Sequence, residues 1–70
     1  MMSKYEVYGV LSYGGYPMTA NEIAKFSKED VDLKFVNEVR DTCFALVNEG
    51  RLLSNKLLYG KREFAINKNR

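Results

Sequence analysis

The last third of the chain constrains the fold most, because its pattern is that of a helix end followed by a hairpin. Gly50 closes an amphipathic segment and can adopt the left-handed conformation that ends helices. Residues 51–56 suit a strand, and residues 62–66 alternate apolar with more polar positions. We therefore predict a helix that leads into a two-stranded hairpin, with Phe64 and Ile66 facing the core.

The turn of this hairpin allows two registers. A two-residue turn at residues 55–56 would pair Leu53 with Leu58, but it needs positive φ at both positions, and lysine is a poor second residue. A wider turn over residues 57–61 places Gly60 at the position that needs a left-handed backbone. We favour the wider turn.

Two short helices are predicted in the first half of the chain. Residues 4–13 carry apolar side chains on one arc, and Gly14-Gly15 ends that helix. Pro17 then limits its neighbourhood to an edge strand at most. Thr19 and Glu22 have the spacing of a capping box that opens a second helix, which runs to residue 26. The apolar residues expected on these helices and at the staple positions are Val7, Val10, Leu11, Met18 and Ile23.

The third predicted helix covers residues 33–49 and is followed by Gly50. Ser27, Asp30 and Asp32 could each cap its start, and we favour Asp32. Apolar residues recur at steps of three and four, which indicates one buried face. The residues expected on that face are Val36, Val39, Cys43, Leu46 and Val47.

Composition limits the class of protein. Seventy residues suit one domain, residues 1–70, and 46% hydrophobic with 29% charged residues is typical of a folded chain. No apolar run approaches the ~20 residues that span a bilayer. With one cysteine and no histidine, neither an internal disulfide nor a zinc site is expected. We expect a cytoplasmic, intracellular domain without metal or cofactor and without membrane association.

These segments together resemble the winged helix family of DNA-binding domains. Residues 17–24 are similar to the opening of its second helix, residues 39–52 to its third helix running into a strand, and residues 60–66 to the return strand of the wing. The resemblance implies an α+β fold of three helices with a C-terminal hairpin wing. It also implies that the third helix enters the major groove of double-stranded DNA while the wing touches the phosphate backbone or the minor groove.

The charge distribution agrees with an oriented polyanionic partner. Residues 1–50 hold five Lys/Arg and eight Asp/Glu, net −3, whereas residues 51–70 hold six Lys/Arg and one Glu, net +5. We therefore expect a DNA-binding transcriptional regulator, although basic hairpin residues can also simply protect a strand edge from aggregation. The expected DNA contacts are Lys34, Asn37 and Arg40 in the groove and Arg51, Lys56, Lys61 and Arg62 on the backbone.

A protein-binding adaptor is the alternative. The exposed face expected for the third helix sums to −2, from Lys34 against Glu38, Asp41 and Glu49, and such a face suits phosphates poorly. The hairpin tip, Leu57, Leu58 and Tyr59, could bind another protein or a second copy of the chain, or could pack on the core in another register.

No enzyme is expected from the sequence. Cys43 lacks a histidine to act as its base, and the chain has no phosphate loop or nucleophile motif.

Overall fold

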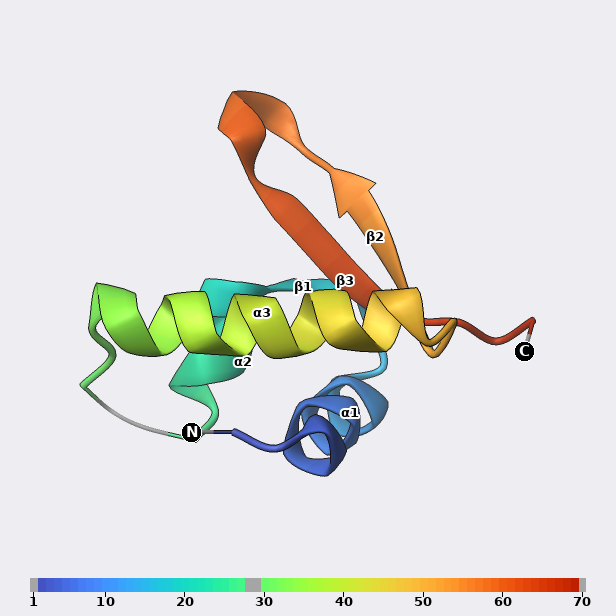
Figure 1. Ribbon diagram of the computed structural model, residues 1–70, viewed down its shortest axis with the longest axis horizontal. Coiled ribbons are helices and arrows are strands. Elements are labelled where there is room, and N and C mark those ends of the chain that lie inside the picture. The colour runs from blue at the N-terminus through green and yellow to red at the C-terminus, as the bar shows by residue number, and fades with distance from the viewer. Residues whose placement is uncertain (1, 28–29, 70) are drawn as a thin grey trace.

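The computed structural model describes residues 2–27 and 30–69, and it shows an α+β fold (Figure 1). Three helices precede a C-terminal antiparallel hairpin, as the sequence predicted. In chain order the elements are α1 (Lys4–Gly14), β1 (Met18–Thr19), α2 (Ala20–Lys25), α3 (Leu33–Asn48), β2 (Leu52–Lys56), the 3₁₀ turn η1 (Leu58–Gly60) and β3 (Arg62–Ile66). Within the described ranges, no helix combines the length and apolarity needed to cross a membrane.

Both N-terminal helices begin with a capping box. At α2 the Thr19 hydroxyl accepts from the Glu22 amide at 3.2 Å, and the Glu22 carboxylate accepts from the Thr19 amide at 2.9 Å, which confirms the predicted start. Ser3 and Glu6 make the same reciprocal pair at α1, which the sequence analysis had not identified. Each box satisfies two amide donors that a helix end otherwise leaves unpaired.

The start of α3 is the one predicted, and the helix ends at Asn48, one residue earlier than predicted. The Asp32 carboxylate accepts from the Phe35 amide at 2.8 Å and so caps the helix. Gly50, with φ of +78°, donates to the Val47 carbonyl while the next amide donates to Leu46, which is the Schellman arrangement. Residues other than glycine adopt this backbone conformation at a cost, so Gly50 sets where the chain leaves the helix.

The buried face of α3 is rotated from the predicted one. Val39, Cys43 and Leu46 are buried as expected, but Val36 and Val47 are only partly buried and pack at the margin of the core. Phe35 and Thr42 are buried in their place, because α1 and α2 cover one side of α3 while the sheet covers the other. The buried Thr42 hydroxyl donates to the Glu38 carbonyl at 3.1 Å, so its burial leaves no donor unsatisfied.

The sheet has the order β1-β3-β2, with all neighbours antiparallel. Met18 of β1 pairs with Phe64 of β3, so β1 is the short edge strand that the proline-containing segment allowed. Phe64 is 1% exposed, and Ile66 is half-buried against the core, which confirms that both face inward.

The wider hairpin turn is correct, and the two-residue turn is wrong. Leu53 pairs with Ala65, not with Leu58, and the Leu57 amide donates to the Lys61 carbonyl at 2.7 Å across the turn. Gly60 has φ of +75°, as the wider turn requires. The strands therefore extend to Lys56 and Arg62, and this register decides which hairpin side chains share a face.

Replacing Thr19 with alanine should destabilise the protein through loss of the α2 cap. We expect the free energy of unfolding to fall by about 1 kcal/mol, measured by denaturant titration followed by circular dichroism. Asn21→Ala serves as the control, because Asn21 is exposed and lies two residues after Thr19 in the same helix. Its free energy of unfolding should stay within about 0.5 kcal/mol of that of the parent. Equal effects of the two changes would contradict the role given to the cap.

Candidate nucleic-acid interface

The hairpin register places two cations on the face that looks toward α3. Lys56 and Arg62 are direct partners, and Ser54 pairs with Phe64 one step closer to the core. Because strand side chains alternate, Lys56 and Arg62 lie on the same face as the buried Phe64 ring. Like charges directly opposite one another destabilise a sheet, by a few tenths to about 1 kcal/mol. The free protein therefore carries a local repulsion that an anion would relieve.

Arg62 is held in place by contacts to both the hairpin and α3. Its guanidinium Nη1 donates to the Ser54 hydroxyl at 3.1 Å. Its Cζ atom lies 5.9 Å from the centroid of the Phe44 ring, within the range of a cation–π interaction. Phe44 in turn meets Phe64 edge to face, with ring centroids 5.3 Å apart. Sequence analysis had not assigned Phe44 a role, although its spacing of four residues from Arg40 placed both on one side of the helix.

Arg40 lies one helical turn before Phe44, on the side of α3 that faces the hairpin. The side chain of Arg40 is exposed. Asn37, three residues before Arg40 in the helix, is half-exposed. Neither Arg40 nor Lys56 nor Lys61 has an ion-pair partner within residues 2–27 and 30–69. We name Arg40, Lys56, Lys61 and Arg62 the basic cluster. Lys61 precedes β3 in extended backbone, so by alternation its side chain lies on the face of the hairpin opposite that of Arg62.

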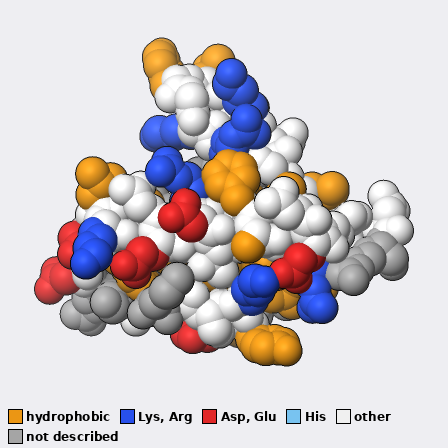
Figure 2. Space-filling model, in the orientation of Figure 1, with side chains coloured by type: hydrophobic (Ala, Val, Ile, Leu, Met, Phe, Trp, Pro, Cys, Tyr) orange, Lys and Arg blue, Asp and Glu red, His pale blue; other side chains and the backbone are white. Residues whose placement is uncertain are grey.

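Acidic side chains border the basic cluster on α3 but not on the hairpin face that carries Arg62. Glu63 pairs with Asn55 and Thr19 and so points to the reverse side of the sheet. Asp41 lines a hollow with residues of the N-terminal segment and of α3, which places it toward α1. Figure 2 shows basic side chains gathered over the hairpin and above α3, with acidic side chains over α3 and near its N-terminal end. The outer surface of α3 therefore has a hairpin side and a more acidic α1 side.

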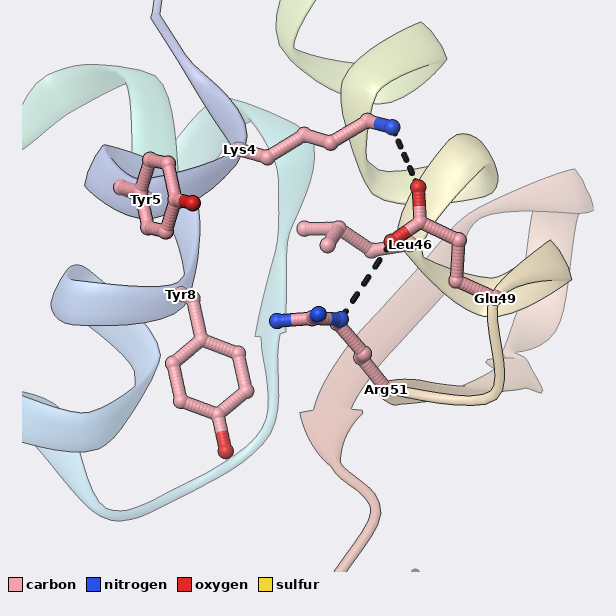
Figure 3. A pocket seen from close by; sticks show the side chains of 6 residues that line it. All are labelled: Lys4, Tyr5, Tyr8, Leu46, Glu49 and Arg51. Carbon is pink, nitrogen blue, oxygen red and sulfur yellow. Dashed lines mark hydrogen bonds and ion pairs between the residues drawn. The ribbon is translucent and has the colours of Figure 1, made fainter.

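Two of the expected DNA contacts lie away from the cluster. Lys34 is one turn before Glu38, on the acidic side of α3. Arg51 lies at the base of the hairpin, where its Nε is 3.3 Å from a Glu49 carboxylate oxygen, and Lys4 pairs with the other oxygen (Figure 3). The charge of Arg51 is thus matched locally. The fold brings the remaining expected contacts to the hairpin side of the molecule: Asn37, Arg40, Lys56, Lys61 and Arg62.

The Lys4–Glu49–Arg51 arrangement closes one side of a hollow of about 250 Å³. Tyr5, Tyr8 and Leu46 supply the rest of its lining, and Figure 3 shows the two tyrosines on α1 across from Arg51. Exposed ion pairs contribute little to stability, so this one mainly links α1 to the end of α3.

The hairpin tip is apolar and exposed. Leu57, Leu58 and Tyr59 are 37%, 80% and 96% exposed, so the alternative in which they pack on the core does not hold for the last two. Tyr59 has φ of +61°, a left-handed conformation that costs a residue with a side chain roughly 1 kcal/mol. A bulky side chain held exposed at that cost is typical of a surface that contacts a partner.

Cys43 takes no part in this surface. It is fully buried, and burial raises the pKa of its thiol from the ordinary 9.0 to about 12. Among the described residues, no group of three or more side chains is arranged to hold a metal ion. Comparison with family models, curated proteins and solved structures found no match. Any function must therefore be inferred from the geometry of the chain's own residues.

Burial should protect the Cys43 thiol from reagents. At pH 8 we expect labelling by a thiol-reactive probe to be at least about 10³-fold slower than in denaturant, because reaction requires unfolding. The folded pKa lies above the unfolded one, so the neutral thiol stabilises the fold fully below about pH 9, and this contribution is lost as the pH rises toward about 12. Labelling at the same rate with and without denaturant would show that Cys43 is accessible.

Proposed function

We propose that this chain is a small winged helix DNA-binding protein that acts as a transcriptional regulator. In this proposal the hairpin is the wing and contacts the phosphate backbone, while α3 lies in the major groove. The observation that carries the proposal is the basic cluster, whose members lie on the hairpin side of the molecule. None of its four cations has an ion-pair partner in the described part of the chain, and a cluster of cations without carboxylate partners suits a polyanion.

The two parts of the cluster would have different tasks. Lys56, Lys61 and Arg62 would contact phosphates, and such contacts fix the position of the protein on the duplex but read no sequence. Arg40 could contact a guanine edge and Asn37 an adenine edge, the side-chain pairings that discriminate bases. Arg62 is already oriented by Phe44 and Ser54, so it would lose less side-chain freedom on binding than a free arginine.

The expected affinity follows from the number of phosphates neutralised. Three hairpin cations imply a slope of roughly −2.7 for log K against log salt concentration. A single protomer should therefore bind nonspecific duplex DNA with a dissociation constant of about 10⁻⁴ to 10⁻⁶ M at physiological salt. Binding weaker than about 10⁻⁴ M even at low salt would reject the proposal.

The double variant Lys56→Gln, Lys61→Gln should weaken binding and flatten its salt dependence. Each lost contact is worth roughly eightfold in affinity at 0.1 M salt, and the slope should fall by about 1.8. Fluorescence anisotropy with a labelled duplex at several salt concentrations measures both. Lys25→Gln is the matched control, because it removes one exposed charge beside Tyr16 and Phe26, away from the hairpin. An equal loss per charge removed in the control would show that only total charge matters.

A protein-binding adaptor is the second candidate, and the exposed tip together with the acidic side of α3 favours it. Reversing the charge of that side with Glu38→Lys and Asp41→Lys separates the two functions. A DNA-binding protein should keep its affinity for a duplex or gain some, because the change adds positive potential next to the groove. An adaptor that uses this side should lose its protein partner in a pull-down, and unchanged capture would count against that use of the surface.

A further inference from the structure

The outer face of α1 is aromatic and nearly free of charge. Residues 7–21 contain no Asp, Glu, Lys or Arg, the longest such run in the chain. Tyr5 and Tyr13 are each 86% exposed, although tyrosine is a residue that usually buries most of its ring. Soluble domains rarely leave such a face open to water unless it contacts something.

Helix geometry aligns these side chains in one stripe. At 100° per residue, Tyr5, Gly9 and Tyr13 fall within an arc of about 80°, directly opposite the buried Val7 and Leu11. Gly9 is exposed, and a Cβ atom built on it meets no atom within 4 Å. The stripe therefore consists of two exposed tyrosine side chains, one on each side of Gly9, which has no side chain.

The stripe has the symmetry of a surface that pairs with itself. Tyr5 and Tyr13 are each four residues from Gly9, so a two-fold axis through Gly9 brings Tyr5 of one copy level with Tyr13 of the other. We propose that two copies of this chain associate through α1, with the two helices antiparallel and crossing at Gly9. An isologous contact needs a surface that complements itself, and the equal spacing of Tyr5 and Tyr13 about Gly9 supplies one. Gly9 at the crossing allows close approach of the two helices. The charges nearest the stripe on α1, Lys4 and Glu6, flank Tyr5 at one end of the helix, so the antiparallel arrangement keeps each away from its own copy.

The area available fits a reversible dimer. Four tyrosine side chains, at roughly 150–250 Å² each, could bury about 600–1,000 Å² in total. A hollow lined by Tyr8, Ser12 and Tyr16 lies beside the stripe and adds apolar surface that the partner can cover. Such an interface lies at the low end of specific associations, so monomer and dimer should exchange with concentration.

This arrangement leaves the basic cluster free. Figure 1 shows α1 on the side of the molecule opposite the hairpin tip. A dimer formed through α1 would therefore have its two hairpins on opposite outer sides, pointing away from each other, and both would stay accessible. The dimer itself does not depend on DNA binding, and it is measured without DNA.

Sedimentation velocity of the full chain, from about 10 µM to about 1 mM, tests the association. Gly9→Glu places two carboxylates at the two-fold axis and should weaken the dimer at least tenfold. It should not harm the monomer, because the position is open and glutamate favours a helix more than glycine does. Tyr59→Glu adds the same charge at the exposed hairpin tip and should leave the dimer unchanged.

Cross-linking tests the antiparallel geometry. Gly9→Cys should form a disulfide between two copies under mild oxidation, because the axis brings the two residues together. Ser12→Cys, on the same helix, should not, since its copies would lie about 9 Å apart along the axis. The native Cys43 is buried and will not compete.

Three results would overturn the proposal. The first is a monomer across the whole concentration range. The second is a dimer that Tyr59→Glu dissociates and Gly9→Glu does not, which would place the interface at the hairpin tip. The third is equal cross-linking of both cysteine variants, which indicates parallel helices or random collision.

Discussion

The edge-to-face contact between Phe64 of β3 and Phe44 of α3 holds the hairpin against the third helix. In the sheet Phe64 pairs with Met18 of β1 and with Ser54 of β2, so this buried ring lies where all three strands meet α3. Burying an aromatic side chain of this size contributes about 1.5–3 kcal/mol, a large share of the stability of a 70-residue domain. The direction in which the hairpin leaves the body depends on this contact.

The same contact determines which charges come together. Phe44 supports the guanidinium of Arg62 on its ring and lies one turn after Arg40, so the core packing extends outward into the basic cluster. On the other side of α3, Asp41 faces the N-terminal segment, and Glu49 is bound by Lys4 and Arg51. The net charge of −2 summed over the exposed helix face thus conceals two sides of different character. Separation of charge by packing explains how a helix with more acidic than basic residues can border a basic surface.

Local signals in the sequence were sufficient to predict the helices and the C-terminal hairpin. The capping residues Thr19 and Asp32, and the helix-ending Gly50, act through hydrogen bonds and dihedral angles within a few residues, so they can be identified without the fold. Gly60 indicated the wider hairpin turn for the same reason, because its left-handed backbone conformation is a local requirement of that turn. The buried face of α3 could not be located as accurately, because periodicity gives a stripe but not the direction from which other elements cover it. Phe35 and Thr42 are buried only because α1 and α2 pack on that side.

The sequence by itself determined the order and type of the helices and hairpin strands, with helix ends correct to within one residue, and it favoured the correct hairpin turn, because caps, turn residues and alternation are short-range constraints. Only the tertiary structure decided which cations are neighbours. Lys34 and Arg51 carry the same charge as Lys56 and Arg62, yet they lie beside carboxylates, while Arg62 is fixed over an aromatic ring of α3. Neighbours of this kind can be far apart in the chain: Lys4 and Glu49, which form an ion pair, are separated by 45 residues. Such pairs form only after burial of the core has fixed the relative positions of the elements.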